Sequence, residues 1–309
     1  MVIDGINGEG PLQRAPMNPD TEKIRELIER WMVMRLDPAA AAWIRDRQEV
    51  IRQGEKKSLF LAFGMVPRKV GKSDLQLTDE ELSEANEVRP GWNPKGWSID
   101  QATRSLFLLT LPPTEPTTLV GILDQLASTG EVGELVAIYQ SLPLLPDPEA
   151  HVLRAAEGIR TNIKAVFCAV AYQNPYPSEQ FNEDQWNQMV LKCQFICVPM
   201  SPIVGLDERS NPALSAMVLD YIHERNAAKR PFAPELWRCV GRHANADALS
   251  ELHAVLTTGS DIEKYAAGLA LSESSEPAAQ NLLAAAPVVA AEISAGRITW
   301  ASIDAISSH

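Results

Sequence analysis

Hydrophobic residues recur every three or four positions along most of this chain, the spacing that places them on one face of an α-helix. The first stripe follows Asp20, whose carboxylate can cap a helix. Asp37 and Pro38 then end one helix and start the next, because proline fits the first helical turn but not the interior. The pattern predicts helices near 20–36, 38–54, 59–66, 78–86, from 98 onward, 117–128, 132–140, 149–172, 182–197, 211–225, 234–240, 245–257, 260–272, 277–286 and 287–295.

No segment alternates hydrophobic and polar residues as a half-buried strand would, so we expect an all-α protein. Consecutive helix pairs with short turns predict a helical-hairpin solenoid of HEAT or armadillo-like character, although no strict repeat length appears. Proline and glycine interrupt the pattern at 67–97, which predicts an irregular loop. We expect a flexible N-terminus at 1–17 and a single helical domain at 18–309, with HEAT-like pairs at 234–309.

Composition narrows the classes of function. The chain has 309 residues and a formal net charge of −12, which disfavours nucleic acid as a partner. Its opening residues do not resemble a secretory signal, and no apolar run is long enough to span a bilayer. The four cysteines form no CxxC pair and are expected to be reduced thiols. We therefore expect a cytoplasmic protein that does not span the membrane.

Common enzyme fingerprints are missing, including the phosphate-binding loop, the dinucleotide fingerprint and the nucleophile elbow. His223 and Glu224 begin a zinc-protease motif, but Ala227 occupies the position of its second histidine. We accordingly assign no catalytic residue, no metal ligand and no cofactor.

Polar residues are concentrated in the middle of the chain. Glu157, Arg160, Thr161 and Lys164 form a stripe on the expected helix 149–172, which also fits a solvated face with internal ion pairs. The next helix has Trp186 on its core side, with Asn187 and Lys192 on the opposite side. Arg209 precedes a helix capped by Asn211, whose N-terminus attracts anions.

A third polar group lies on the expected helix 211–225. Asp220, His223 and Glu224 have the spacing that places them on one helical face. Two carboxylates and an imidazole are able to hold a metal or perform acid–base chemistry. They are equally able to form a structural hydrogen-bond network, and the spacing alone does not separate these alternatives.

Three unusual stretches resemble the EboA family. They comprise 89–100 with Arg104; 154–162 with 166–167, 174–177 and 186–192; and 205–211 with 220–225. The resemblance implies a role in metabolite traffic toward the periplasm, beside a membrane protein and other enzymes of the same gene cluster. Ile159, Cys168 and Asn226 depart from the family pattern, but no polar motif residue is lost.

Three functions remain open: a binding or adaptor protein for a small-molecule metabolite or a partner protein, an enzyme acting through Glu157, Asp220, His223 and Glu224, and a structural scaffold. We favour the first, and we expect Arg160 and His223 to lie within about 12 Å of each other, one interhelical distance plus side-chain reach. The expected binding residues are Glu157, Arg160, Thr161, Asn162, Asn174, Tyr176, Trp186, Asn187, Lys192, Asp207, Arg209, Asn211, Asp220, His223, Glu224 and Arg225.

Overall fold

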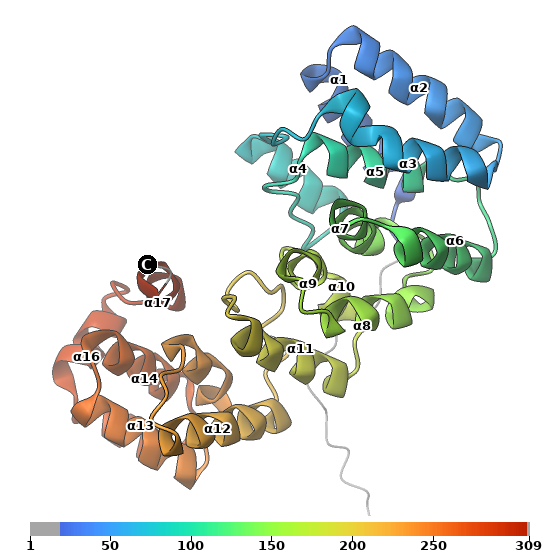
Figure 1. Ribbon diagram of the computed structural model, residues 1–309. Coiled ribbons are helices and arrows are strands. Elements are labelled where there is room, and N and C mark those ends of the chain that lie inside the picture. The colour runs from blue at the N-terminus through green and yellow to red at the C-terminus, as the bar shows by residue number, and fades with distance from the viewer. Residues whose placement is uncertain (1–18, 308–309) are drawn as a thin grey trace, which may run out of the picture. The chain divides into compact units, whose positions relative to one another are not determined.

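The computed structural model describes residues 19–307, in which helices are joined by turns and loops and no strand is present (Figure 1). An isolated antiparallel bridge joins Asp74 and Ser98. The all-α prediction is confirmed, while the predicted flexible segment 1–17 lies outside the described residues. The described chain divides into two compact units, an N-terminal unit at 19–182 and a C-terminal unit at 183–307, and each is described by itself. The single-domain organisation stays a prediction.

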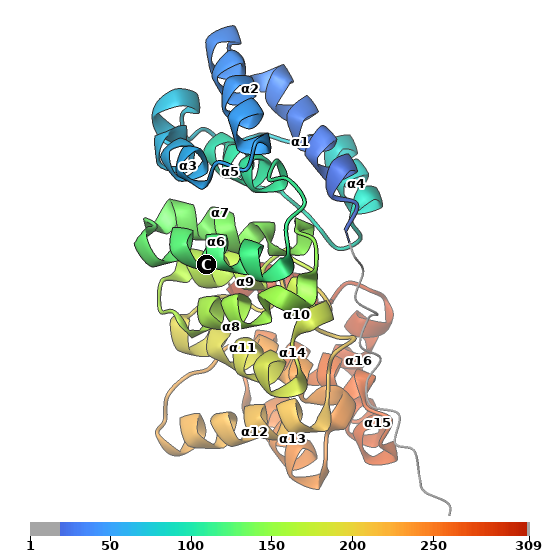
Figure 2. The ribbon, with the colours of Figure 1, turned by 90° about the vertical axis from the view of Figure 1, so that its right-hand side faces the viewer.

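The N-terminal unit is built around a central buried helix. All residues of α5 except Gln101 are buried, and α5 packs against α1, α3 and α7. In turn, α7 lies between α5 and α9 (Figures 1 and 2). The helices of this unit are α1 (Thr21–Arg35), α2 (Pro38–Arg52), α3 (Lys56–Val70), α4 (Asp79–Val88), α5 (Ile99–Leu109), α6 (Pro116–Thr129), α7 (Val132–Ser141), η1 (Leu142–Leu144), η2 (Pro148–His151), α8 (Val152–Arg160), α9 (Lys164–Ala171) and α10 (Tyr176–Gln180).

Helix α3 continues through Pro67 to Val70, so the prediction that the irregular segment begins at Pro67 is wrong. Proline has no N–H group to offer the carbonyl of Phe63 one turn earlier. The Arg104 side chain supplies that bond instead, with its Nε donating to the Phe63 carbonyl oxygen at 3.1 Å. The helix then ends at Gly71, whose φ of 81° is the left-handed conformation that glycine adopts easily.

The single helix predicted over 149–172 is instead two helices, α8 and α9. The break lies at Thr161, which has an extended backbone and whose hydroxyl accepts a hydrogen bond from the Ile163 N–H at 3.1 Å. This local bond competes with the helical ladder. As a result Ile163 is 43% exposed, and Lys164 begins a new helix.

The C-terminal unit gathers around α14, which packs against α13, α15, α16, α17 and both 3₁₀ segments. A Cβ atom added at Gly268 would collide with Val289, so glycine permits the close approach of α14 and α16. The predicted helix at 234–240 is a 3₁₀ helix, and the final helix was not predicted. The elements are α11 (Glu183–Ile196), α12 (Pro212–Ala227), η3 (Pro234–Cys239), η4 (Gly241–His243), α13 (Ala246–Thr258), α14 (Asp261–Glu273), α15 (Pro277–Ala284), α16 (Pro287–Ser294) and α17 (Trp300–Ser307).

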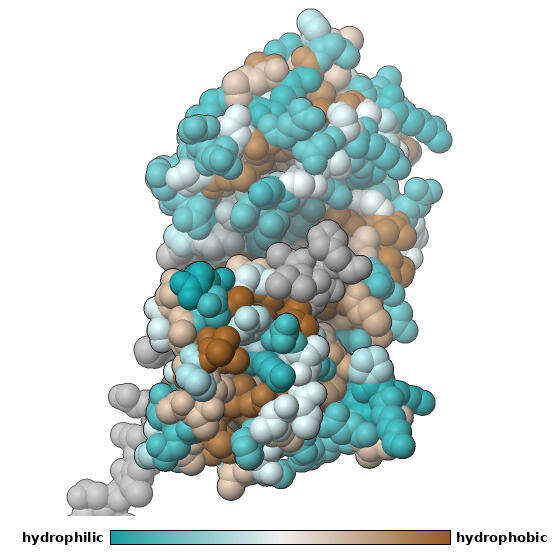
Figure 3. Space-filling model, turned by 90° about the vertical axis from the view of Figure 1, so that its left-hand side faces the viewer, coloured by the Kyte–Doolittle hydropathy of each residue, from teal (hydrophilic) through white to brown (hydrophobic). Residues whose placement is uncertain are grey.

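Exposed hydrophobic residues are scattered over several helices. Leu153 on α8 is 82% exposed and Val288 on α16 is 70% exposed. Figure 3 shows hydrophobic patches separated by hydrophilic side chains on one face of the protein. Singly exposed apolar residues are ordinary on soluble proteins, so cavities and polar clusters are better guides to a functional site here.

Candidate functional site

Several of the unusual polar residues stabilise the N-terminal unit from within. Arg89 donates two hydrogen bonds to the Glu179 carboxylate, at 2.8 and 2.6 Å, and a third to the Pro143 carbonyl at 2.8 Å. Both side chains of this ion pair are almost fully buried. Removing one partner of such a pair leaves an uncompensated buried charge. Arg89 therefore joins the end of α4 to the 142–144 turn and to α10.

Asn174 and Tyr176, two of the expected binding residues, are also buried and engaged internally. The Asn174 side-chain oxygen accepts from the Tyr176 N–H at 2.9 Å, and its amide donates to the Ala169 carbonyl at 3.0 Å. The Tyr176 hydroxyl donates to the Pro148 carbonyl, and burial raises the pKa of this phenol. These contacts fix the turn between α9 and α10.

Glu157, Arg160 and Thr161 come together on a surface groove of about 390 Å³ in the N-terminal unit. Glu157 and Arg160 form an exposed ion pair on the last turn of α8. Arg154 extends the groove and pairs with Asp124 of α6. Exposed ion pairs of this kind contribute little stability. Asn162 is exposed in the α8–α9 connection but is not among the groove residues.

In the C-terminal unit, Asn187 and Asn211 form a reciprocal pair of amide hydrogen bonds, at 3.2 and 2.8 Å. The Asn211 oxygen also accepts from the Leu214 N–H at 2.8 Å and so caps α12. Both side chains are buried. The prediction that Asn187 lies on the polar side of its helix is therefore wrong, because its amide is satisfied inside the unit. Cys197 follows the end of this helix and is exposed.

Two arginines near α11 and η3 are held by neighbours within the C-terminal unit. The Arg209 guanidinium lies 4.7 Å from the centre of the Trp186 ring, and burial lowers the pKa of Arg209. Arg238 donates to both carboxylate oxygens of Asp207, at 2.8 and 2.7 Å. Burial opposes ionisation of Asp207, but Arg238 outweighs it and the pKa of Asp207 is lowered. Lys192 is half-buried, and burial lowers its pKa.

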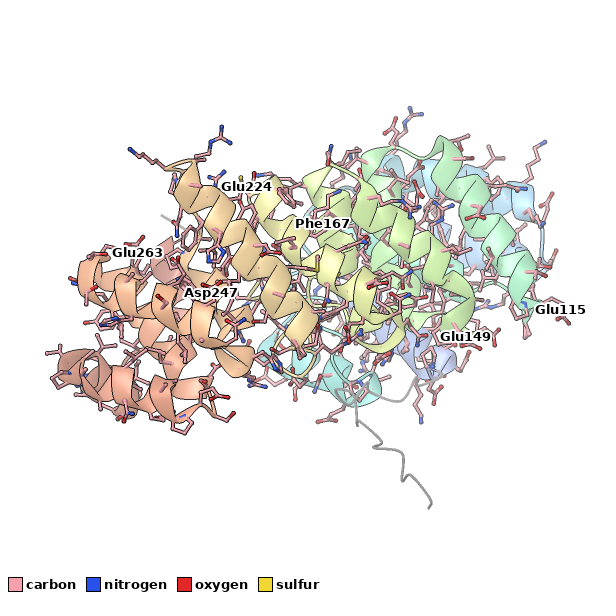
Figure 4. All side chains as sticks on the ribbon, turned by 90° about the horizontal axis from the view of Figure 1, so that it is seen from below. Glu115, Glu149, Phe167, Glu224, Asp247 and Glu263 are labelled. Atoms are coloured by element: carbon pink, nitrogen blue, oxygen red, sulfur yellow. The ribbon has the colours of Figure 1, made fainter. Side chains whose placement is uncertain are left out.

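His223 faces acidic residues of another helix. Its Nε2 lies 3.8 Å from an Asp247 oxygen and 3.6 Å from a Glu251 oxygen, both on α13. Asp220 and Glu224 are exposed, and Figure 4 shows Glu224 on α12 beside the helix that carries Asp247. Within residues 19–307, no group of three His, Cys, Asp or Glu side chains is arranged to hold a metal ion.

A feature that the sequence did not indicate is a cavity of about 520 Å³ in the C-terminal unit. Of the expected residues, Arg225 reaches it; this side chain donates to the Pro231 carbonyl and lies 5.8 Å from the centre of the Tyr221 ring. The cavity lining consists of Cys193, Gln194, Cys197, Val198, Pro199, Tyr221, Arg225, Pro231, Phe232, Ala233, Glu235 and Asp304.

Glu235 is the most unusual titratable group of this cavity. Both of its carboxylate oxygens lie within hydrogen-bond distance of the Met200 N–H, at 3.1 and 3.2 Å, and its side chain is buried. Burial, together with a hydrogen bond to Asp304, raises the pKa of Glu235 to about 8. A strongly raised carboxyl pKa in a cavity is a physical indicator of a functional site.

Arg160 and His223 belong to different units, so their predicted proximity stays a prediction. Some of the expected residues are buried structural groups and some line the groove or the cavity, whereas Asn162, Asp220, His223 and Glu224 line neither of these two.

A family model described as "Metabolite traffic protein EboA" matches residues 24–241, and the chain belongs to this family. No curated protein and no solved structure matches the chain. Among residues 19–307, no helix combines the length and apolar character needed to cross a membrane.

Proposed function

We propose that this protein is a non-enzymatic binding or adaptor protein in the traffic of a specialised metabolite, or its precursor, toward the periplasm. The family description gives the metabolite-traffic role in general terms. The observation that carries the finer proposal is the cavity of about 520 Å³ in the C-terminal unit. Small-molecule sites in proteins commonly have volumes of roughly 300–1,000 Å³, so this cavity is large enough for a small metabolite.

The lining of the cavity supports binding. Tyr221 and Phe232 supply aromatic surface, while Arg225 and Glu235 supply charged or hydrogen-bonding groups. A mostly apolar wall with a few fixed polar groups is the usual composition of a ligand site. Met200 fixes the Glu235 carboxyl group, and the Pro231 carbonyl fixes Arg225. The polar groups are thus positioned before a ligand arrives, which reduces the entropy cost of binding.

The groove that contains Glu157, Arg160 and Thr161 is our candidate for a partner protein of the same gene cluster. In this proposal the protein works in the cytoplasm, and its helix pairs form a HEAT-like scaffold. The close packing of α6 with α7, and of α13 with α14, supports the scaffold. Exposed charge pairs favour specificity and association rate over affinity, which suits a transient contact.

The alternative, an enzyme acting through Glu157, Asp220, His223 and Glu224, has one observation in its favour. The His223 ring lies 3.8 Å from an Asp247 carboxylate oxygen and 3.6 Å from a Glu251 carboxylate oxygen. However, none of Asp220, His223 and Glu224 lines the cavity described above. The cavity and its lining therefore support a binding role, whereas the enzyme alternative is supported only by the acidic neighbours of His223.

Equilibrium dialysis against a metabolite extract of the host distinguishes the two functions. A binding protein enriches one small molecule on its own side and returns it unchanged, as detected by mass spectrometry. Formation of a new product that disappears in a His223→Gln variant would establish the enzyme alternative. Enrichment of no metabolite at all would contradict the binding proposal.

A further inference from the structure

Helix α3 and the two residues after it carry only positive charge, although the protein as a whole is acidic. Residues 56–72 include five Lys or Arg side chains and no Asp or Glu, in a chain of net charge −12. All five side chains are exposed: Lys56, Lys57, Arg68, Lys69 and Lys72. Within residues 19–307, none of the five forms an ion pair or a side-chain hydrogen bond. These charges are therefore not used to stabilise the fold.

The exposed side of α3 is also partly apolar. The opposite side of the helix is buried and packs against α2 and α5, and Figure 2 shows α3 at the edge of the N-terminal unit. Leu61 is 58% exposed and Met65 is 40% exposed. These two residues are four positions apart and therefore neighbours on the helix surface, with Lys57 one turn before them and Arg68 one turn after. Together with the other three cations they form what we call the α3 face.

Three carboxylates lie at the margins of the α3 face. Glu55 and Asp74 flank it in the sequence, and each accepts a hydrogen bond from a residue within three positions. Glu134 of α7 approaches Gly64, where an added Cβ atom would lie 3.6 Å from its Oε1. Its other carboxylate oxygen accepts from the Glu131 N–H at 3.0 Å. Five cations against these three carboxylates leave the α3 face positively charged.

The chemistry of the α3 face suits a layer of negative charge better than a single anion. None of its five cations lines the groove or the cavity described above. Four of the five are lysines, which act as mobile point charges, whereas paired recognition of carboxylates favours the rigid fork of arginine. The acidic groups elsewhere on the protein interfere little, because physiological salt screens exposed charges beyond about 8 Å.

We infer that the α3 face binds the surface of a membrane that contains anionic lipids. The cations lie near the lipid phosphate groups, and Leu61 and Met65 enter the headgroup region, which adds apolar contact to the electrostatic attraction. This inference goes beyond the proposed function and does not depend on the ligand cavity. It brings the protein to the membrane surface, which a metabolite must reach before it moves toward the periplasm.

Co-sedimentation of the full-length protein with lipid vesicles tests the inference. Vesicles of phosphatidylcholine alone are compared with vesicles of phosphatidylcholine and phosphatidylglycerol in about equal amounts, at about 0.1 M salt. We expect the protein to bind the anionic vesicles at least about tenfold more tightly, and this preference to shrink as the salt concentration rises. Equal affinity for the two kinds of vesicle, or no binding to the anionic ones, would overturn the inference.

Variants locate the binding. Lys57→Gln/Arg68→Gln removes two cations of the α3 face and is expected to lose at least about fivefold in affinity for the anionic vesicles. The matched control, Lys229→Gln/Arg230→Gln, removes two exposed cations of the C-terminal unit and should bind like the wild type. Both variants should keep the wild-type melting temperature, because all four positions are exposed. Equal losses in the two variants, or no loss in the first, would place the contact elsewhere and overturn the inference.

Polyglutamate serves as a probe for the competing partner, an acidic protein. It should bind more weakly than the anionic vesicles, because it offers no headgroup region for Leu61 and Met65. Tighter binding of polyglutamate than of the vesicles, with the same loss in Lys57→Gln/Arg68→Gln, would assign the α3 face to an acidic protein and refute the lipid assignment.

Discussion

Replacement of Glu235 by glutamine should make the protein more stable at alkaline pH. Glutamine keeps the side-chain shape and an oxygen that accepts from the Met200 N–H, but it cannot ionise. In the folded protein the pKa of Glu235 is raised to about 8, from an ordinary value of 4.5. Between these values the folded state binds a proton that the unfolded state has lost, so the free energy of unfolding falls as pH rises.

The size of the effect follows from the same shift. One pKa unit corresponds to about 1.4 kcal/mol, so ionising Glu235 at pH 9 costs the wild type on the order of a few kcal/mol. Asp304 on α17 raises the pKa of Glu235 and Arg238 on η3 lowers it, and Arg225 lines the same cavity. The change in stability with pH therefore depends on these groups as well as on Glu235. We therefore expect the variant to exceed the wild type by at least about 2 kcal/mol at pH 9.

Urea unfolding followed by tryptophan fluorescence at pH 5, 7 and 9 measures this difference. Trp237 and Trp300 report on the unit that contains Glu235. Glu276→Gln, which changes an exposed residue of the same unit, should follow the wild-type pH dependence. Parallel pH profiles for the wild type and Glu235→Gln, or a variant that is less stable at pH 9, would refute the assignment of a buried, protonated Glu235.

Three further predictions concern internal contacts. Arg89→Met should lower the free energy of unfolding by about 3–5 kcal/mol, because it removes the guanidinium that pairs with the buried Glu179 carboxylate; urea unfolding measures this, and a loss below 1 kcal/mol would contradict it. Gly268→Ala should destabilise by about 1–3 kcal/mol through its clash with Val289, and Val289→Ala should recover part of the loss in the double variant; additive losses would exclude that contact as the cause. Burial lowers the pKa of His151, so stability should fall as pH drops below its ordinary value of 6.5, and His151→Gln should lose less between pH 7 and 5; identical acid profiles would argue against a buried neutral histidine.

Much of the secondary structure was predictable because its causes are local. Asp20 and Asn211 cap helices where the sequence places them, since a cap needs only a side chain and the next backbone N–H groups. Pro67 was misjudged because the bond that compensates for it comes from Arg104, on another helix. Thr161 was misjudged because its hydroxyl can either point to solvent or bond to Ile163, and periodicity does not distinguish these states.

The candidate site was predictable only in part. Glu157, Arg160 and Thr161 are close in sequence and meet in one groove, whereas Lys164, predicted on the same stripe, begins α9 and is not among the groove residues. The cavity was missed because its residues extend from Cys193 to Asp304, and tertiary packing alone brings them together. Asn187 was assigned to the wrong side of its helix because only the fold supplies its partner, Asn211. Residue type indicated which side chains form directed bonds, but not whether those bonds face a ligand or the core.

Native mass spectrometry of the protein purified from its own host tests the central claim most directly. The wild type should retain a small molecule that is released unchanged on denaturation. An Ala233→Phe variant, which adds a ring at a residue lining the cavity, should lack that molecule while keeping the melting temperature of the wild type. An Ala233→Phe protein that retains the same molecule at the same occupancy, or a wild type that carries none, would contradict the account.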